Sequence, residues 1–295
     1  MSRAHALLIA VIAFSTCVPA RAETLVFLFA GQSNMAAADS IVAGTGKEDL
    51  AGAGLQTDAD RNALFTYGCV FDPDSPLSYA WGDIRGHRGA SFSKVDPPFF
   101  VHGPEVGFAR TLYANGLRDI AIIKVANNIP VPPKGPQWPW TNKDATTASP
   151  DYYGRWAKFV NRRLAELTAK GKKWQIAGFV WDEGIDDALS GATEEQYAAN
   201  LRQLIAQLRA DFGTPTTPFV LARSKSTMPS PAAMNAVRAA QVQVASGDPH
   251  AAWISSDDLP NVNTHHFPTE SQLLIGERLG SAYLKLKEGA PPKAK

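Results

Sequence analysis

Short apolar runs alternate with helical patterns along most of this 295-residue chain. Such alternation is typical of parallel strands joined by helices that pack on both faces of one sheet. The expected strands are residues 25–30, 120–126, 176–181, 219–222 and, with a weaker pattern, 251–254. The sequence therefore predicts an α/β chain folded as a three-layer α/β/α sandwich with a central, mostly parallel sheet.

The expected helices carry apolar side chains at helical spacing. The clearest spans residues 194–212, where Thr193 and Gln196 form a capping box. Thr269 and Gln272 show the same pattern before a last helix. The other expected helices are residues 105–115, 153–170 and 231 to about 245.

Two long segments fit this alternation poorly. Residues 36–103 and 127–150 are rich in glycine, proline, aspartate and aromatic side chains. They are too long for ordinary connections, so we expect them to lie over the carboxyl edge of the sheet, where such folds bind ligands.

The N-terminal segment is typical of a secretory signal peptide, because an apolar run follows a positive charge and ends in Ala-Arg-Ala at residues 20–22. We predict a signal peptide (1–22), one folded domain (23–288) and a disordered tail (289–295). The apolar run is shorter than a membrane helix of ~20 residues. We therefore expect a secreted or periplasmic protein that is free of the membrane after cleavage.

Charge and composition exclude some classes of function. The formal net charge is +1, and no cluster basic enough to hold nucleic acid is visible. After cleavage Cys69 would be the only cysteine, so an exported chain would form no internal disulfide and would depend on its hydrophobic core. With 45% hydrophobic residues, the length suits one large domain.

Ser33 follows the first expected strand in the segment Gly31-Gln32-Ser33-Asn34-Met35. A serine at the start of a helix lies where backbone N–H groups can stabilise a developing oxyanion. The same position suits a helix cap, a structural role that serine also favours. The residue types alone leave both interpretations open.

Residues 28–35, Leu-Phe-Ala-Gly-Gln-Ser-Asn-Met, resemble the opening block of the sialate O-acetylesterase and acetyl xylan esterase branch of the SGNH hydrolases. Residues 103–110 resemble its second element, and residues 266–278 resemble its final block. The resemblance extends over residues 25–283. It implies the three-layer sandwich and removal of an acetyl ester from a carbohydrate, without a metal or an organic cofactor.

The same resemblance assigns roles to two side chains. Ser33 corresponds to the family's nucleophile, and His266 corresponds to the general base that takes the serine proton. We expect His265, beside the base, to be a loop residue. The implied substrate is an acetylated carbohydrate.

Three departures from the family pattern affect this site. Asn263 replaces an aspartate that usually orients the histidine, and loss of that charge should slow a serine hydrolase greatly. Glu183 replaces a glutamine that resembles an oxyanion donor; only a protonated carboxyl, its pKa raised by burial, could still donate. Asn127 and Asn128 replace a Gly-Gly-Thr turn whose backbone contributes to the same oxyanion hole, and asparagine tolerates the positive φ that such a turn needs.

Two interpretations fit these departures. In the first, catalysis persists because Asp182, at the end of the third expected strand, orients His266. In the second, the site has decayed into a catalytically weak or inactive glycan-binding module. The candidate catalytic residues are therefore Ser33, His266 and Asp182, and the candidate oxyanion or binding residues are Gln32, Asn128, Glu183, Asn263 and Arg223.

Other side chains have a functional and a structural interpretation. Arg223 could bind an anionic sugar, although we expect it to pair with a nearby carboxylate. Trp138 and Trp140 could form a platform for a sugar ring or plug an edge of the core. The acidic residues of 182–187 lack a recognised spacing of metal ligands, and we expect them to face solvent or cap a helix.

Overall fold

The computed structural model describes residues 23–69, 78–89, 99–126 and 152–289. The predicted signal peptide, the end of the tail and the segment with Trp138 and Trp140 lie outside these residues. The strands are β1 (Thr24–Gly31), β2 (Ala63–Cys69), β3 (Tyr79–Gly82), β4 (His87–Gly89), β5 (Phe99–Val101), β6 (Ile120–Ala126), β7 (Trp174–Asp182), β8 (Phe219–Ala222) and β9 (Ala251–Ile254). The helices are η1 (Val42–Gly44), α1 (Asp58–Asn62), α2 (Pro104–Ala114), α3 (Tyr152–Ala169), α4 (Ile185–Leu189), α5 (Glu194–Phe212), α6 (Pro231–Ser246) and α7 (Thr269–Lys287).

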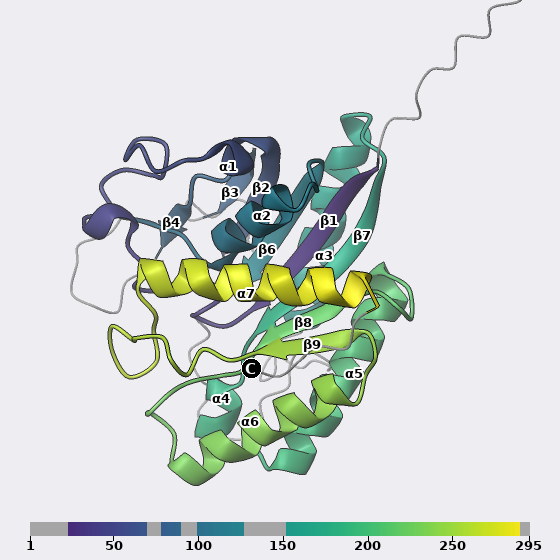
Figure 1. The fold of residues 1–295 in the computed structure, drawn as a ribbon. Helices are drawn as coiled ribbons and strands as arrows, with labels where there is room; N and C mark the ends of the chain where they lie inside the picture. The colour runs from purple at the N-terminus through teal and green to yellow at the C-terminus, as the bar shows by residue number, and fades with distance from the viewer. Residues whose placement is uncertain (1–22, 70–77, 90–98, 127–151, 290–295) are drawn as a thin grey trace, which may run out of the picture.

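Seven of the strands form one central sheet in the order β3-β2-β6-β1-β7-β8-β9 (Figure 1). All neighbouring pairs are parallel except β2 and β3, which are antiparallel. In this order β1 lies at the centre, between β6 and β7. The carboxyl end of β1, where Ser33 follows, is therefore flanked by strands on both sides.

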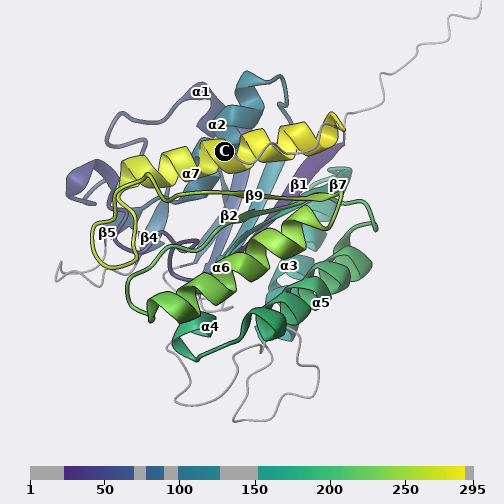
Figure 2. The same ribbon diagram turned by 60° about the horizontal axis from the view of Figure 1, so that its bottom comes forward.

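Helices cover both faces of the sheet, which confirms the expected three-layer sandwich. Figure 2 shows α2 and α7 on one side and α3, α5 and α6 on the other. The side chains of β1 alternate between two cores, as a strand buried on both faces requires. Val26 and Leu28 belong to the core beneath α3, α5 and α6, whereas Phe27 and Phe29 belong to the core beneath α2 and α7.

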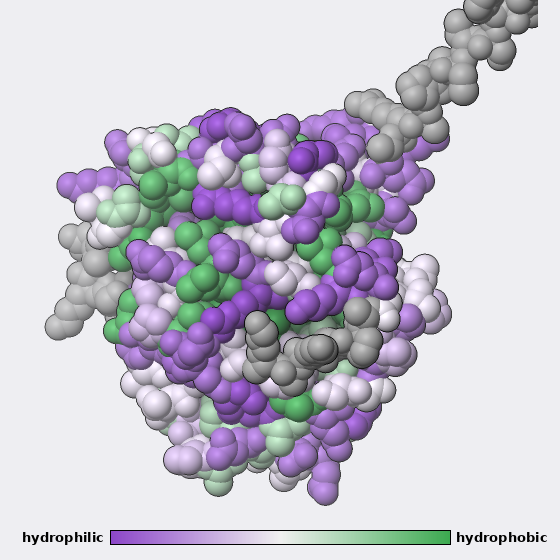
Figure 3. All heavy atoms as spheres, viewed as in Figure 1, coloured by the Kyte–Doolittle hydropathy of each residue, from purple (hydrophilic) through white to green (hydrophobic). Residues whose placement is uncertain are grey.

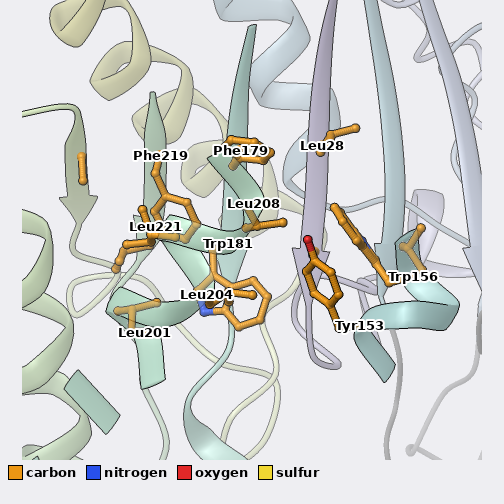
Figure 4. Close-up of a cluster of buried hydrophobic side chains, with 14 of the residues drawn as sticks. Leu28, Tyr153, Trp156, Phe179, Trp181, Leu201, Leu204, Leu208, Phe219 and Leu221 are labelled. Carbon is orange, nitrogen blue, oxygen red and sulfur yellow. The ribbon is translucent and has the colours of Figure 1, made fainter. Parts of the chain in front are cut away.

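Aromatic and leucine side chains fill the first of these cores (Figure 4). Trp156 from α3 and Trp181 from β7 are each 1% exposed, and Leu204 from α5 is equally buried. At ~25 cal/mol per Å² of apolar surface removed from water, burial of this kind supplies the main driving force for folding. The core thus supports the strands that end at the site.

The second core includes an unusually close contact between α2 and α7. A Cβ atom on Gly107 would lie 2.0 Å from the Leu273 carbonyl oxygen, and one on Gly276 would lie 2.1 Å from the Pro104 carbonyl oxygen. Only glycine permits backbones to approach so closely. Leu274 of α7 is exposed. On the face of the molecule seen in Figure 3, hydrophobic residues lie among hydrophilic ones. Among the described helices, none is long and apolar enough to cross a membrane.

The five expected strands and five expected helices are confirmed with small shifts in their ends. Residues 36–103, which fitted the expected alternation poorly, contain elements that the sequence pattern did not predict: η1, α1 and the strands β2 to β5. In β2 the apolar and polar residues mix, and Ala63 and Gly68 weaken its strand pattern. All of β2, from Ala63 to Cys69, pairs with β6, and this pairing stabilises a strand that the local sequence does not predict.

One of the two expected capping boxes is confirmed. The Thr193 side chain accepts from the Gln196 amide at 3.2 Å, and the Gln196 side chain accepts from the Thr193 amide at 3.0 Å. The second is wrong, because Pro268 is the N-cap of α7. Thr269 instead donates to the Ile41 carbonyl at 2.8 Å, and Gln272 donates to the Asn34 carbonyl at 3.0 Å. These two side chains hold the segment that follows Ser33.

Candidate active site

Ser33 lies on a tight turn that leaves the central strand. Gly31, the last residue of β1, has a φ of 155° and lies so close to β7 that a Cβ atom would be 2.1 Å from the Asp182 carbonyl oxygen. The expected helix after Ser33 is absent, because residues 33–39 form consecutive turns instead. The turn is closed by a hydrogen bond from the Ala36 amide to the Gln32 carbonyl at 2.9 Å. Ser33 itself remains partly exposed.

Gln32 fixes the backbone just before the serine. Its amide donates to the Asp182 carbonyl at 2.9 Å, and its side-chain oxygen accepts from the amides of Gly184 and Ile185, each at 3.0 Å. The side chain is only 4% exposed. Gln32, which the sequence placed among oxyanion or binding candidates, thus uses its side chain to clamp the turn after β7.

Three side chains form a continuous hydrogen-bonded relay. His266 Nε2 is 3.0 Å from Ser33 Oγ, and His266 Nδ1 is 2.6 Å from a carboxylate oxygen of Asp39. The His266 and Asp39 side chains are almost fully buried, at 0% and 1% exposure. This is the arrangement in which an imidazole, oriented by a carboxylate, takes the proton of a serine hydroxyl.

Asp39 is held in a strained backbone segment. Its φ is 63°, and Ala37, two residues before it, has a φ of 61°. Such left-handed conformations cost non-glycine residues roughly 1–2 kcal/mol. The hydroxyl of the neighbouring Ser40 donates to the His102 carbonyl at 2.9 Å, and the Ser40 carbonyl accepts from the His102 amide at 3.3 Å. With the Thr269 contact to Ile41, these bonds maintain the strained segment that presents Asp39.

Asn263 joins the relay without replacing its charge. Its side-chain nitrogen is 3.0 Å from the same Asp39 oxygen and 3.3 Å from His266 Nδ1. Its side-chain oxygen accepts from the amides of His265 and His266 at 3.0 and 2.8 Å. Asn263 therefore orients both the carboxylate and the loop that carries the imidazole.

The expectation that Asp182 orients His266 is corrected by this geometry, because Asp39 occupies His266 Nδ1. Asp182 is paired in register with Gly31, and its main-chain oxygen accepts from Gln32. Burial raises the pKa of Asp182 to about 7, with no charged partner to offset it. Such a carboxyl group lacks the stable negative charge needed beside an imidazolium.

Glu183 lies deep beneath the turn after β7. Burial raises the pKa of Glu183 well above its usual range, and the neighbouring charge of Asp187 and a hydrogen bond to that residue raise it further. This direction favours the protonated form, the one state in which the sequence would allow Glu183 to donate to an oxyanion. Its hydrogen bond, however, is to Asp187, while its main-chain oxygen accepts from Tyr197, Ser224 and Gln241. In the described residues Glu183 is thus part of a buried network.

Arg223 pairs with carboxylate and aromatic groups, as the structural interpretation predicted. Its guanidinium donates to Asp257 and to Ser255 Oγ, the latter at 3.2 Å, and lies 4.9 Å from the centre of the Trp253 ring. These contacts tie Arg223 to β9 and the loop that follows it. Asn127 and Asn128, the remaining oxyanion candidates, lie outside the described residues.

The acidic residues after β7 do not assemble a metal site with other ligands. Across the part of the chain that the structure describes, no group of three or more histidine, cysteine, aspartate or glutamate side chains is arranged to hold a metal ion. Of the two expected positions, facing solvent does not hold for Asp187, which is 1% exposed, whereas Asp186 and Asp187 do lie in the first turn of the next helix, α4. The pKa of Asp186 is raised to about 6 by burial.

The sequence brought Ser33 and His266 to attention but missed Asp39. Asp39 follows the family-like segment 28–35 by only four residues, and Asp-Ser is also a common turn sequence. The one available signal was the neutral Asn263 at a position where the family pattern has an aspartate. It indicated that a carboxylate from another segment must orient His266. Finding it requires the positive φ values at Ala37 and Asp39, which sequence pattern does not reveal.

The family model for carbohydrate esterase, sialic acid-specific acetylesterase, matches residues 23–285. The chain belongs to this family. The match covers both ends of the hydrogen-bonded relay and confirms the resemblance found from the sequence motifs. A comparison with curated proteins gave no match.

Solved structures support the same fold at low sequence identity. An Arabidopsis thaliana protein superposes with a TM-score of 0.60 at 19% identity, over 90% of this chain and 99% of that one. A carbohydrate acetylesterase from Xanthomonas citri has a TM-score of 0.57 at 16% identity, over 90% of this chain and 56% of that one. NanS has a TM-score of 0.56 at 13% identity, over 90% and 98% of the two chains. At these identities the likeness establishes the fold of this esterase family member.

Proposed function

We propose that this protein is a serine esterase that removes O-acetyl groups from a carbohydrate, with Ser33 as nucleophile, His266 as general base and Asp39 as the orienting acid. The observation that carries the proposal is the relay of 3.0 Å from Ser33 Oγ to His266 Nε2 and 2.6 Å from His266 Nδ1 to Asp39. Membership of a carbohydrate esterase family supports the substrate class.

Acylation follows from the relay. His266 Nε2 takes the Ser33 proton while Oγ attacks the acetyl carbonyl carbon, and the Asp39 carboxylate stabilises the imidazolium that forms. The C–O bond to the sugar then breaks, His266 returns the proton to the sugar oxygen, and Ser33 carries the acetyl group. In deacylation a water molecule gives one proton to His266 while its oxygen attacks the acetyl carbon. The bond from that carbon to Ser33 Oγ then breaks, His266 returns the proton to Oγ, and acetic acid leaves and ionises to acetate.

Stabilisation of the tetrahedral oxyanion is proposed to come first from the Ser33 amide. Three hydrogen bonds hold Gln32 and thereby fix the peptide that carries this amide. Among the described main-chain groups, none accepts a hydrogen bond from it. A backbone donor that is fixed before reaction costs no reorganisation when charge develops. The expected second donor at Asn128 remains a proposal.

The test is release of acetate from an O-acetylated glycan and from para-nitrophenyl acetate by the chain from Glu23 onwards. We expect hydrolysis by the wild type and near-complete loss in Ser33→Ala. Ser246→Ala is the matched control, because Ser246 is exposed at the end of α6 and distant in sequence from every relay residue. Equal inactivity of wild type, Ser33→Ala and Ser246→Ala would refute the esterase proposal and favour a glycan-binding module without catalysis.

We also propose that residues 1–22 direct export and are then removed. The proposal rests on the apolar run and its Ala-Arg-Ala end. N-terminal sequencing of the protein recovered from a bacterial periplasm or medium tests it. We expect Glu23 as the first residue, and an uncleaved chain retained in the cytoplasm would contradict the proposal.

A further inference from the structure

His265 lies directly against the imidazole of the relay. The centres of the His265 and His266 rings are 3.9 Å apart, and the rings are tilted by 53°. The His266 side chain is fully buried, whereas His265 is partly exposed. His265 therefore covers part of the buried general base on its solvent side.

The backbone of His265 is fixed from both sides. Its amide donates to the Asn263 side chain at 3.0 Å, and its carbonyl accepts from the Asn34 side chain at 3.0 Å. Asn34 follows the nucleophile directly and is 1% exposed. A loop residue without a role would not need a buried side chain next to the nucleophile to hold its carbonyl.

One nitrogen of the His265 ring remains available. Nδ1 is 2.8 Å from the hydroxyl of Thr264, which fixes the orientation of the ring. Within the described ranges Nε2 makes no hydrogen bond, and it is not shielded from solvent. The ring therefore offers one solvent-facing polar atom next to the group that exchanges a proton with the substrate.

We propose that His265 is a specificity-determining residue whose Nε2 hydrogen-bonds a neutral sugar hydroxyl adjacent to the scissile ester. The inference rests on the proposed esterase function. His266 returns its proton to the sugar oxygen that leaves, and in a sugar the hydroxyl on the neighbouring carbon lies within hydrogen-bond reach of that oxygen. A substrate placed for this step brings that hydroxyl to the His265 ring, which lies against His266.

The charge state of the His265 ring indicates which kind of substrate group it can bind. Burial and the neighbouring His266 lower the pKa of His265 to about 4, so the ring is uncharged near neutral pH. A neutral imidazole gives no charge-assisted bond to a carboxylate or phosphate. A sugar hydroxyl both donates and accepts, so it suits Nε2 in either tautomer.

The test compares two substrates that differ by one hydroxyl. One is a mono-O-acetylated methyl glycoside with a free hydroxyl beside the ester, and the other is its deoxy analogue. Since a neutral hydrogen bond contributes roughly 0.5–1.5 kcal/mol, we expect wild-type kcat/KM to favour the hydroxylated substrate by about 2-fold to 13-fold. Para-nitrophenyl acetate, which has no such hydroxyl, reports the chemistry alone.

Two substitutions separate the polar atom from the ring that covers His266. His265→Phe keeps a planar ring without nitrogen, and His265→Gln keeps polar atoms in a smaller side chain. We expect His265→Phe to lose the preference between the two glycosides, expressed as the ratio of their kcat/KM values, and its kcat/KM for para-nitrophenyl acetate gives separately the effect of the substitution on the chemical step. His265→Gln should retain part of the preference. Equal melting temperatures would show that the variants are folded.

The outcomes separate this proposal from the esterase proposal. A preference that persists in His265→Phe, or that is absent from the wild type, would overturn the role of His265 while leaving the esterase intact. If the wild type hydrolysed none of the three substrates faster than Ser33→Ala, the proposed esterase function itself would have failed.

Discussion

At the scale of single residues, the carboxylate beside His266 comes from a different position in the chain than the family pattern indicates. The family-like pattern leaves the neutral Asn263 three residues before His266, yet Asp39 supplies a carboxylate at 2.6 Å from the imidazole. Asn263 now donates to that carboxylate at 3.0 Å. The neutral Asn263 is therefore no reason to expect slow catalysis, because the Asp39 carboxylate provides the negative charge beside His266.

Asn263→Asp tests this view of the site. The new carboxylate would stand beside Asp39, lose the hydrogen bond to it and repel it. Two negative charges on one side of His266 favour the protonated imidazolium, so the acid limb of the profile of kcat/KM against pH should move to higher pH. We expect a larger loss of activity at about pH 6 than at about pH 8, measured with para-nitrophenyl acetate. Higher activity at both pH values would contradict the account, because it would show that the charge at position 263 was limiting.

Sequence motifs were sufficient to find Ser33 and His266 because each lies in a contiguous block. They were insufficient for Asp39 because its place in the relay depends on a left-handed backbone at Ala37 and Asp39. That conformation is maintained by contacts distant in sequence, such as Thr269 to Ile41. A local pattern does not contain this information.

At the scale of elements, α7 connects the fold to the site. Its N-terminal turn holds Ile41 and the Asn34 carbonyl through Thr269 and Gln272, and its middle packs on α2 through glycines. Displacement of α7 should therefore reach the relay. The helices and central strands were predictable from apolar periodicity, whereas β2 was not, because its stability comes from pairing with β6.

Gly276→Ala tests whether the close packing of α7 on α2 supports the relay. The added methyl group would lie 2.1 Å from the Pro104 carbonyl oxygen and 2.7 Å from the Phe108 amide nitrogen, so the helices must separate. We expect a loss of about 1–3 kcal/mol in the free energy of unfolding and a lower kcat. Leu274→Ala, on the exposed side of the same helix, is the control and should change both little. Urea denaturation and aryl acetate assays measure the two effects, and unchanged stability in Gly276→Ala would refute the close packing.

At the scale of the whole molecule, buried titratable groups of two kinds give opposite dependences of stability on pH. Burial raises the pKa of Asp182 to about 7 and of Asp186 to about 6, so their contribution to stability falls as pH rises from about 4 towards those values. Burial lowers the pKa of His87 to about 3 and of His102 to about 4, so their contribution rises with pH until the unfolded value near 6.5 is passed. The two trends oppose each other below that pH.

Asp182→Asn isolates the carboxyl contribution. The unfolded wild type releases the Asp182 proton near pH 4 and the folded protein releases it near pH 7, so the wild type loses more stability across that interval than the variant, which has no carboxyl group at position 182. We expect the free energy of unfolding of the variant, minus that of the wild type, to be larger at about pH 8 than at about pH 5. Urea denaturation at the two pH values measures this difference. An equal difference at both pH values would show that Asp182 is not a buried acid with a raised pKa.

The most direct test of the central claim is kcat for para-nitrophenyl acetate in Asp39→Asn and Asp182→Asn. Asparagine keeps the shape of Asp39 and removes its charge, so we expect kcat to fall on the order of 10³–10⁴-fold with the melting temperature nearly unchanged. Asp182→Asn should stay within about tenfold of wild type, because Asp182 does not contact His266 in the described structure. Wild-type activity in Asp39→Asn, or an equal loss in Asp182→Asn, would contradict a relay of Ser33, His266 and Asp39.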